Sequence, residues 1–148
     1  MRLSQIRSEL VAEHHALKQA ATDLEAEVQR VVSGQHTLDA MRASLTRFAD
    51  QLALHNRHEE TLLRDELRTI DAWGPQREAL MDEDHEAEHA DVVRSVTESL
   101  WLHDHEEIAR RVQAMVRRVL EHLRREEKEI LHPDLLRDDV VSISGASE

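Results

Sequence analysis

Two stretches of the chain share one pattern: HNRHEETLL at residues 55–63 and HLRREEKEI at residues 122–130. Both read His-x3-Glu-Glu, and an aliphatic residue follows three positions after the second glutamate. Helix positions four apart lie on one face, so each copy places an imidazole and a carboxylate where a helix should bury leucine. A buried carboxylate is costly unless its charge is compensated. The repeat therefore predicts that something in the core balances two glutamates.

The composition restricts the class of protein. A length of 148 residues suits one domain with a single core. Tyrosine is absent and aromatic residues make up 2%, which disfavours an all-β fold. The absence of cysteine excludes disulfides and thiolate sites. Eleven histidines are many for this length.

The charge and hydropathy of the chain bear on its partners. A net charge of -12 argues against binding nucleic acid or an anionic membrane through a general basic surface. The first ten residues lack the apolar run of a signal peptide, and no apolar stretch reaches 18 residues. We therefore expect a cytoplasmic protein with no membrane and no nucleic-acid partner.

Hydrophobic periodicity predicts the fold. Apolar residues recur every three or four positions in four runs, at about 3–31, 38–63, 80–100 and 108–130. Gly34 and the Gly74–Pro75 pair mark two turns, and Asp104 with Glu107 resembles a capping box before the last run. Four amphipathic helices with short connections indicate an all-α, up-down-up-down antiparallel four-helix bundle.

The expected domain organisation is simple. The bundle should occupy residues 1–136. Residues 137–148 lose the helical period, and we expect them to form a flexible acidic tail.

Polar residues fill the gaps in all four apolar stripes. His14 lies 20 residues before Gly34 and His55 lies 21 after it, so at about 1.5 Å per residue both should be roughly 30 Å from that turn. Similar counts hold at the other turns. Antiparallel packing should thus gather five imidazoles and two carboxylates in one layer: His14, His55, Glu59, His85, His89, His122 and Glu126.

The residue types in this layer favour a metal site. Imidazole with carboxylate suits iron, manganese or zinc. Seven ligands are too many for one four-coordinate ion and suit two ions, which carboxylates can bridge at a separation of about 3.5–4 Å. A ferritin-like site is disfavoured because Glu86–His89 is the only Glu-x-x-His among these residues. A metal-free bundle with core histidines that respond to pH is the structural alternative.

Four motifs resemble those of the hemerythrin family, specifically the bacterial hemerythrin-like (HHE cation-binding) domains. They are EHHAL at 13–17, HNRHEETLL at 55–63, HEAEH at 85–89 and HLRREEKEI at 122–130, and together they cover about residues 3–132. The resemblance implies two iron ions joined by an oxo or hydroxo bridge, with zinc or manganese as substitutes. It implies that the terminal ligands are His14, His55, His85, His89 and His122, and that Glu59 and Glu126 bridge the ions.

The resemblance also implies a function. It suggests a non-haem di-iron protein that binds or senses dioxygen or a related small ligand. The last helix has His-x3-Glu instead of the His-x4-Asp of oxygen-carrying hemerythrins, which is similar to relatives linked to sensing, iron handling, or peroxide and nitric oxide chemistry. An enzyme acting on hydrogen peroxide (catalase-like) or nitric oxide therefore stays open.

Several polar neighbours of the motifs are expected outside the site. His15 should be a surface or supporting residue and His58 a surface residue. Glu60 and Glu127, the second glutamates of the two repeats, are expected to face solvent or pair with arginines.

Overall fold

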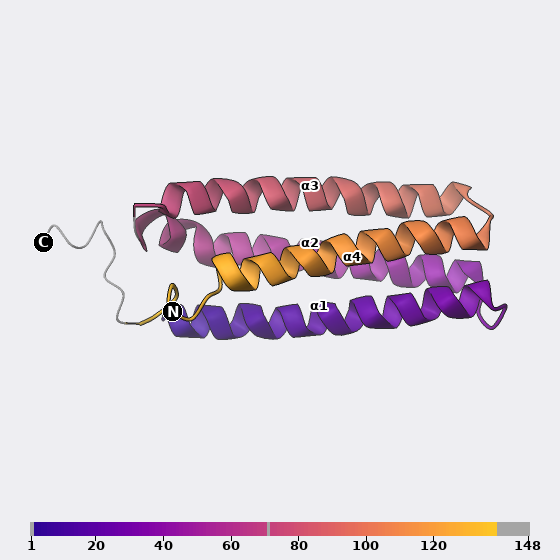
Figure 1. The fold of residues 1–148 in the computed structure, drawn as a ribbon, viewed down its shortest axis with the longest axis horizontal. Coiled ribbons are helices and arrows are strands. Elements are labelled where there is room, and N and C mark those ends of the chain that lie inside the picture. The colour runs from indigo at the N-terminus through magenta and orange to yellow at the C-terminus, as the bar shows by residue number, and fades with distance from the viewer. Residues whose placement is uncertain (1, 71, 139–148) are drawn as a thin grey trace, which may run out of the picture.

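The four expected helices are present and run alternately up and down (Figure 1). The structure is a computed structural model that describes residues 2–70 and 72–138, with the backbone only at Leu100. The helices are α1 (Leu3–Val32), α2 (Leu38–Ile70), α3 (Gly74–Trp101) and α4 (His105–Glu129), and the described residues contain no strand. Each helix packs on its neighbours in the cyclic order α1, α2, α3, α4, α1. This confirms the all-α, four-helix architecture.

The turns follow from local chemistry. Gly34 has φ +79°, a left-handed conformation that glycine adopts without steric cost, and it ends α1. Asp104 caps α4 by accepting hydrogen bonds from the backbone N–H groups of Glu106 and Glu107. At the tight α2–α3 turn, a Cβ on Gly74 would lie 1.8 Å from the carbonyl oxygen of Leu67. Only glycine allows the two helices to approach so closely there.

The segment after α4 folds back on the start of α1. Leu131 and Leu136 are buried beside Ile6 and Leu10. The described end of the chain also contacts α1, where Asp138 accepts hydrogen bonds from Ser4 N at 3.0 Å and Ser4 Oγ at 2.7 Å. Residues 139–148, most of the expected acidic tail, lie outside the described residues.

A polar layer divides the core into two apolar clusters. The larger cluster includes Leu17, Phe48 and Met115 and extends to the α1–α2 and α3–α4 turns. The smaller cluster includes Leu10 and Met81 and lies toward the α2–α3 turn. Leu10 and Leu17 belong to different clusters although they are only seven positions apart on α1. The division falls at His14, one of the residues that interrupt the stripes.

The stripe on α3 differs from the sequence expectation by one residue. We expected both His85 and His89 to face the core, but His89 is exposed, as is Val93, four residues further on, at 47%. From Met81 to Ser99, the buried residues of α3 alternate steps of four and three: Met81, His85, Glu88, Val92, Ser95 and Ser99. Two successive steps of four residues turn the side chain about 80° around the helix and away from the interface. Alternating steps of four and three keep the side chains on the buried face.

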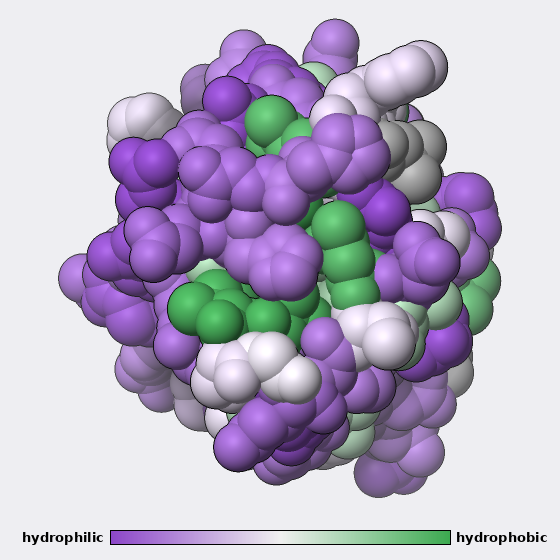
Figure 2. All heavy atoms as spheres, turned by 90° about the vertical axis from the view of Figure 1, so that its right-hand side faces the viewer, coloured by the Kyte–Doolittle hydropathy of each residue, from purple (hydrophilic) through white to green (hydrophobic). Residues whose placement is uncertain are grey.

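The end of the bundle that holds the α1–α2 and α3–α4 turns is mostly hydrophilic, with some apolar side chains visible (Figure 2). Figure 2 views the bundle from the end that holds the α1–α2 and α3–α4 turns, where hydrophobic atoms show between hydrophilic ones. Trp101, the last residue of α3, is 77% exposed. Among the described residues, no helix combines the length and the apolar content that a membrane span requires.

Replacing Gly74 by alanine should destabilise the bundle strongly. The new Cβ meets backbone oxygen, which cannot rotate away, so we expect a loss of about 3 kcal/mol in the free energy of unfolding, measured by chemical denaturation. Gly34→Ala is the control, because its Cβ has open space and only the left-handed backbone is strained, at a cost of about 1 kcal/mol. Equal effects of the two variants would contradict the close approach at Gly74.

Candidate metal centre

Six of the seven residues expected in the polar layer come together at the centre of the bundle. We define the polar layer by these six, all of which are buried: His14, His55, Glu59, His85, His122 and Glu126. Each helix contributes one imidazole, and α2 and α4 each add the glutamate four residues later. Glu59 is fully buried and Glu126 is 2% exposed, so solvent cannot compensate their charge.

Every imidazole of the polar layer directs its Nε2 atom toward the two glutamates. Glu59 Oε2 lies 3.4 Å from His14 Nε2 and 3.1 Å from His55 Nε2. Glu126 Oε2 lies 3.0 Å from His85 Nε2 and 3.2 Å from His122 Nε2. Each glutamate also reaches the other half of the layer. Glu59 Oε1 is 3.2 Å from His85 Nε2, and Glu126 Oε1 is 3.3 Å from His14 Nε2.

The donor atoms form two groups, each of a size that could hold an ion. In one group, ligand atoms of His14, His55, Glu59 and Glu126 all lie within 4.8 Å of one another. In the other, those of His85, His122 and Glu126 do so. Ligands at about 2.1 Å from a single ion can be no more than about 4.2 Å apart, so a small contraction would complete either set. Glu126 belongs to both groups, as a bridging carboxylate would.

Several buried atoms of the polar layer lack a hydrogen bond. They are His55 Nε2, His122 Nε2, Glu59 Oε1 and Glu126 Oε1. An imidazole nitrogen or carboxylate oxygen lies close to each of these atoms, but the two groups are not aligned for a hydrogen bond. An unsatisfied buried polar atom costs about 1–3 kcal/mol, and four around one centre are unusual. Because these atoms are also the preferred ligands of transition metals, the residues present fit two metal ions.

The second nitrogen of each imidazole faces a further carboxylate. We call these four the outer carboxylates: Glu13, Glu60, Glu88 and Glu127. The Nδ1 atom lies 3.2 Å from Glu127 in His14, 2.8 Å from Glu13 in His55 and 2.8 Å from Glu60 in His85. His122 Nδ1 forms a short contact with Glu88. Each imidazole thus has a core glutamate, or both of them, on its Nε2 side and one outer carboxylate on its Nδ1 side.

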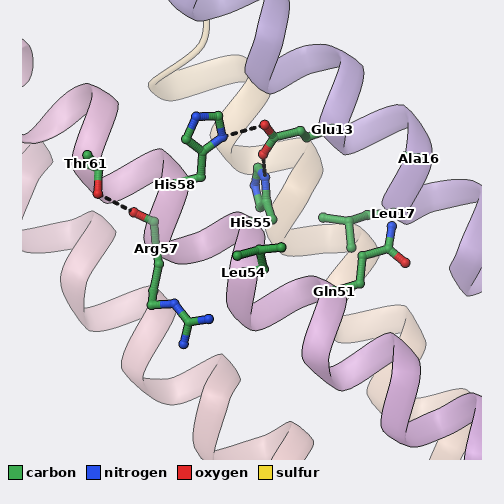
Figure 3. A pocket seen from close by; sticks show the side chains of 9 residues that line it. All are labelled: Glu13, Ala16, Leu17, Gln51, Leu54, His55, Arg57, His58 and Thr61. Atoms are coloured by element: carbon green, nitrogen blue, oxygen red, sulfur yellow. Dashed lines mark hydrogen bonds and ion pairs between the residues drawn. The ribbon is translucent and has the colours of Figure 1, made fainter.

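A groove between α1 and α2 reaches the polar layer at His55 (Figure 3). It has a volume of about 610 Å³, and its apolar walls include Ala16, Leu17 and Leu54. In Figure 3, Glu13 lies between two histidines, with Oε1 2.8 Å from His55 Nδ1 and Oε2 2.5 Å from His58 Nδ1. His58, which we expected at the surface, is 40% exposed and belongs to this hydrogen-bonded chain.

The two core glutamates shift the pKa of the imidazoles upward. Burial alone lowers these values, but hydrogen bonds and charge from Glu126 and Glu59 outweigh it, raising the pKa of His14 to about 9 and of His85 to about 11. For His122, Glu126 and Glu88 together raise the pKa to about 10. Burial opposes ionisation of Glu126, yet its hydrogen bonds hold its pKa well below the usual range. Without metal, protons on the imidazoles supply the charge that balances the carboxylates.

His89 is the one expected site residue that the structure does not bring to the layer. Its side chain is exposed, because the buried stripe of α3 continues from His85 to Glu88. His89 borders a hollow between α2 and α3 that also contains Glu60 and His85. The layer therefore holds four imidazoles instead of five.

The outer carboxylates are the site residues that sequence reasoning missed. Glu60 and Glu127 were expected to face solvent or pair with arginines, but they contact His85 and His14, and Glu127 also pairs with Lys18. The signal was present in the doubled glutamate of both repeats, since the second residue lies about 100° around the helix from the first.

In comparisons with known proteins, no family model matches the chain, and no curated protein or solved structure gives a significant match. The resemblance to hemerythrin-like domains accordingly stays a prediction.

The metal-free protein should lose stability as the pH rises. The pKa values of His14, His85 and His122 exceed the value of about 6.5 for an unfolded chain. Their contribution is therefore complete below about pH 6.5 and disappears as the pH passes through about 9 to 11. The lowered pKa of Glu126 acts at the other end, so its contribution is present above about pH 4.5 and falls in stronger acid. Urea denaturation of chelator-treated protein should show a maximum between about pH 5 and 6.5.

The variant Glu126→Gln provides the control for this prediction. Without the carboxylate that raises the imidazole pKa values, the alkaline loss should move to lower pH. A wild-type curve that is flat from pH 6 to pH 9 and beyond would contradict the coupling.

Proposed function

We propose that the chain binds two transition-metal ions in the polar layer and uses them to bind dioxygen or a related small ligand. The observation that supports this most directly is the convergence of four Nε2 atoms and two carboxylates in one buried layer. Four of these potential metal-ligand atoms have no hydrogen bond. Two cations would balance the buried charge of Glu59 and Glu126, which an ordinary apolar core would not tolerate.

The residues divide naturally between two ions. His14 and His55 would hold one ion, His85 and His122 the other, and Glu59 and Glu126 would be shared. The two imidazoles of each pair lie edge to face, with ring centroids 4.8 Å apart for His14 and His55 and 5.5 Å apart for His85 and His122. Each ion would be held by two imidazole nitrogens and the shared carboxylates, and a small ligand could bind where the protein supplies no ligand atom.

Iron is the metal we propose, with zinc or manganese able to substitute. Imidazole and carboxylate donors suit all three metals, and the resemblance to hemerythrin-like domains favours iron. Bound iron would supply the redox chemistry. The chain's own contribution is to orient the imidazoles, to keep water from the core with the two apolar clusters, and to leave an approach at the α1–α2 groove.

An enzyme acting on peroxide or nitric oxide is the second candidate. It is favoured by the symmetric division of imidazoles, two for each ion, because both ions would then keep open positions. The Glu13–His58 pair also places polar groups next to His55 at the groove. Disproportionation of hydrogen peroxide to water and dioxygen would need no external reductant.

Metal analysis tests the proposed site. The chain expressed with added iron should carry about two metal ions, and Glu126→Ala should remove most of them because both donor groups include this carboxylate. The matched control is His89→Ala, which should keep the wild-type metal content because His89 is exposed. A wild-type chain without metal, with Glu126→Ala neutral or stabilising, would favour the metal-free bundle instead.

The two candidate functions differ in their reaction with oxygen and peroxide. If the protein binds dioxygen, the reduced iron form exposed to air should give a stable oxygenated absorption spectrum that reverses under argon. If it is a peroxide enzyme, added hydrogen peroxide should be consumed with release of dioxygen, measured with an oxygen electrode. The absence of both responses would overturn the proposed use of the site, whatever its metal content.

A further inference from the structure

The outer carboxylates connect the four helices in a ring. Glu13 on α1 contacts His55 on α2, and Glu60 on α2 contacts His85 on α3. The ring continues from Glu88 on α3 to His122 on α4, and from Glu127 on α4 to His14 on α1. Each helix therefore supplies one imidazole to the polar layer and one carboxylate to the imidazole of the next helix.

We propose that the outer carboxylates are positioning residues that keep the proton of each imidazole on Nδ1 and so direct an unprotonated Nε2 at the metal. This inference rests on the proposed function, because it assigns a role toward the bound metals. It concerns Glu13, Glu60, Glu88 and Glu127, none of which is itself placed among the metal ligands.

The proton of a neutral imidazole can lie on either ring nitrogen. A neutral ring carries one N–H, and an ionised carboxylate can only accept a hydrogen bond. The nitrogen that faces an outer carboxylate must then be the donor, which leaves the lone pair on the other nitrogen. In all four histidines the nitrogen facing outward is Nδ1 and the one facing the core glutamates is Nε2. A carboxylate acceptor of this kind also makes the ligating nitrogen more basic.

The acceptor lies on a different helix from the imidazole in every case. An acceptor on the same helix could move with the ring, whereas one on the neighbouring helix fixes the ring against the bundle as a whole. The doubled glutamates supply a core carboxylate and an outer carboxylate from neighbouring positions. Glu59 points into the layer, and Glu60, one residue later, contacts His85 on α3. The same holds for Glu126 and Glu127 on α4.

Glu60 gives the clearest test of the four. Glu13 also contacts His58, Glu88 also accepts a hydrogen bond from Asn56, and Glu127 also pairs with Lys18. The contact described for Glu60 is with His85 alone. Its side chain is 29% exposed, so truncation leaves no closed cavity in the core.

The experiment uses the full chain, zinc(II) as the probe, and a chromophoric chelator as competitor. Glu60→Ala should weaken zinc binding by about 10- to 100-fold, and Glu60→Gln should recover most of the loss because its amide oxygen still accepts from Nδ1–H. The matched control is Glu86→Ala, which removes an exposed acid from the same hollow between α2 and α3. Loss of that screened charge should change the affinity by no more than about twofold.

Nuclear magnetic resonance of the zinc-loaded protein supplies a second readout. The His85 Nδ1–H proton should give a slowly exchanging downfield resonance in wild type and in Glu60→Gln. Glu60→Ala should lose this resonance while those of the other three imidazoles remain. A purely structural effect would not single out one ring.

Four outcomes would overturn the inference. Equal weakening by Glu60→Ala and Glu86→Ala would mean that the acids only attract cations. An unchanged His85 resonance in Glu60→Ala would mean that the proton does not depend on Glu60. If wild type bound no zinc, the proposed function would fall together with this inference, whereas normal binding by wild type and Glu60→Ala alike would remove this inference alone.

Discussion

Two buried carboxylates in the middle of an apolar bundle are the constraint on which the rest of the structure depends. Glu59 and Glu126 are held between two hydrophobic clusters where water cannot solvate them. Their charge must be met by protons on the surrounding imidazoles or by metal ions. The raised pKa values of His14, His85 and His122 correspond to the first arrangement, in which protons on the imidazoles balance the carboxylates. The second arrangement, in which metal ions balance the carboxylates, is the basis of the function we propose.

The arrangement of the polar layer is nearly two-fold symmetric. α1 with α2 supplies two imidazoles and a glutamate, and α3 with α4 supplies the same set. The symmetry is not repeated at the outer carboxylates: Glu13 directly precedes His14 in the chain, whereas Glu88 lies one turn after His85. Their additional partners also differ, a surface histidine for Glu13 and an asparagine for Glu88. Any functional difference between the two halves would therefore arise from groups outside the layer.

Much of the fold follows from local sequence. The helices, the glycine turns and the aspartate cap are each decided by residues within a few positions of one another. The six residues of the polar layer were also predictable, because helices of known rise that meet at known turns fix the depth of every side chain. The expectation for His89 extended the α3 stripe by two steps of four, whereas the structure leaves His89 exposed. A small difference in the rotation of one helix, which packing decides, separates His89 from the stripe that contains Glu88.

The sequence by itself determined that four amphipathic helices form and that histidine and glutamate interrupt their apolar stripes at one level, since both depend on spacing along a single helix. The tertiary structure alone decided which carboxylate each imidazole meets on its outer side. Those contacts join side chains 25 to 113 residues apart in the chain and depend on how each helix is rotated about its axis against its neighbour. No pattern within one helix encodes that rotation, because it is set by how all four stripes pack together.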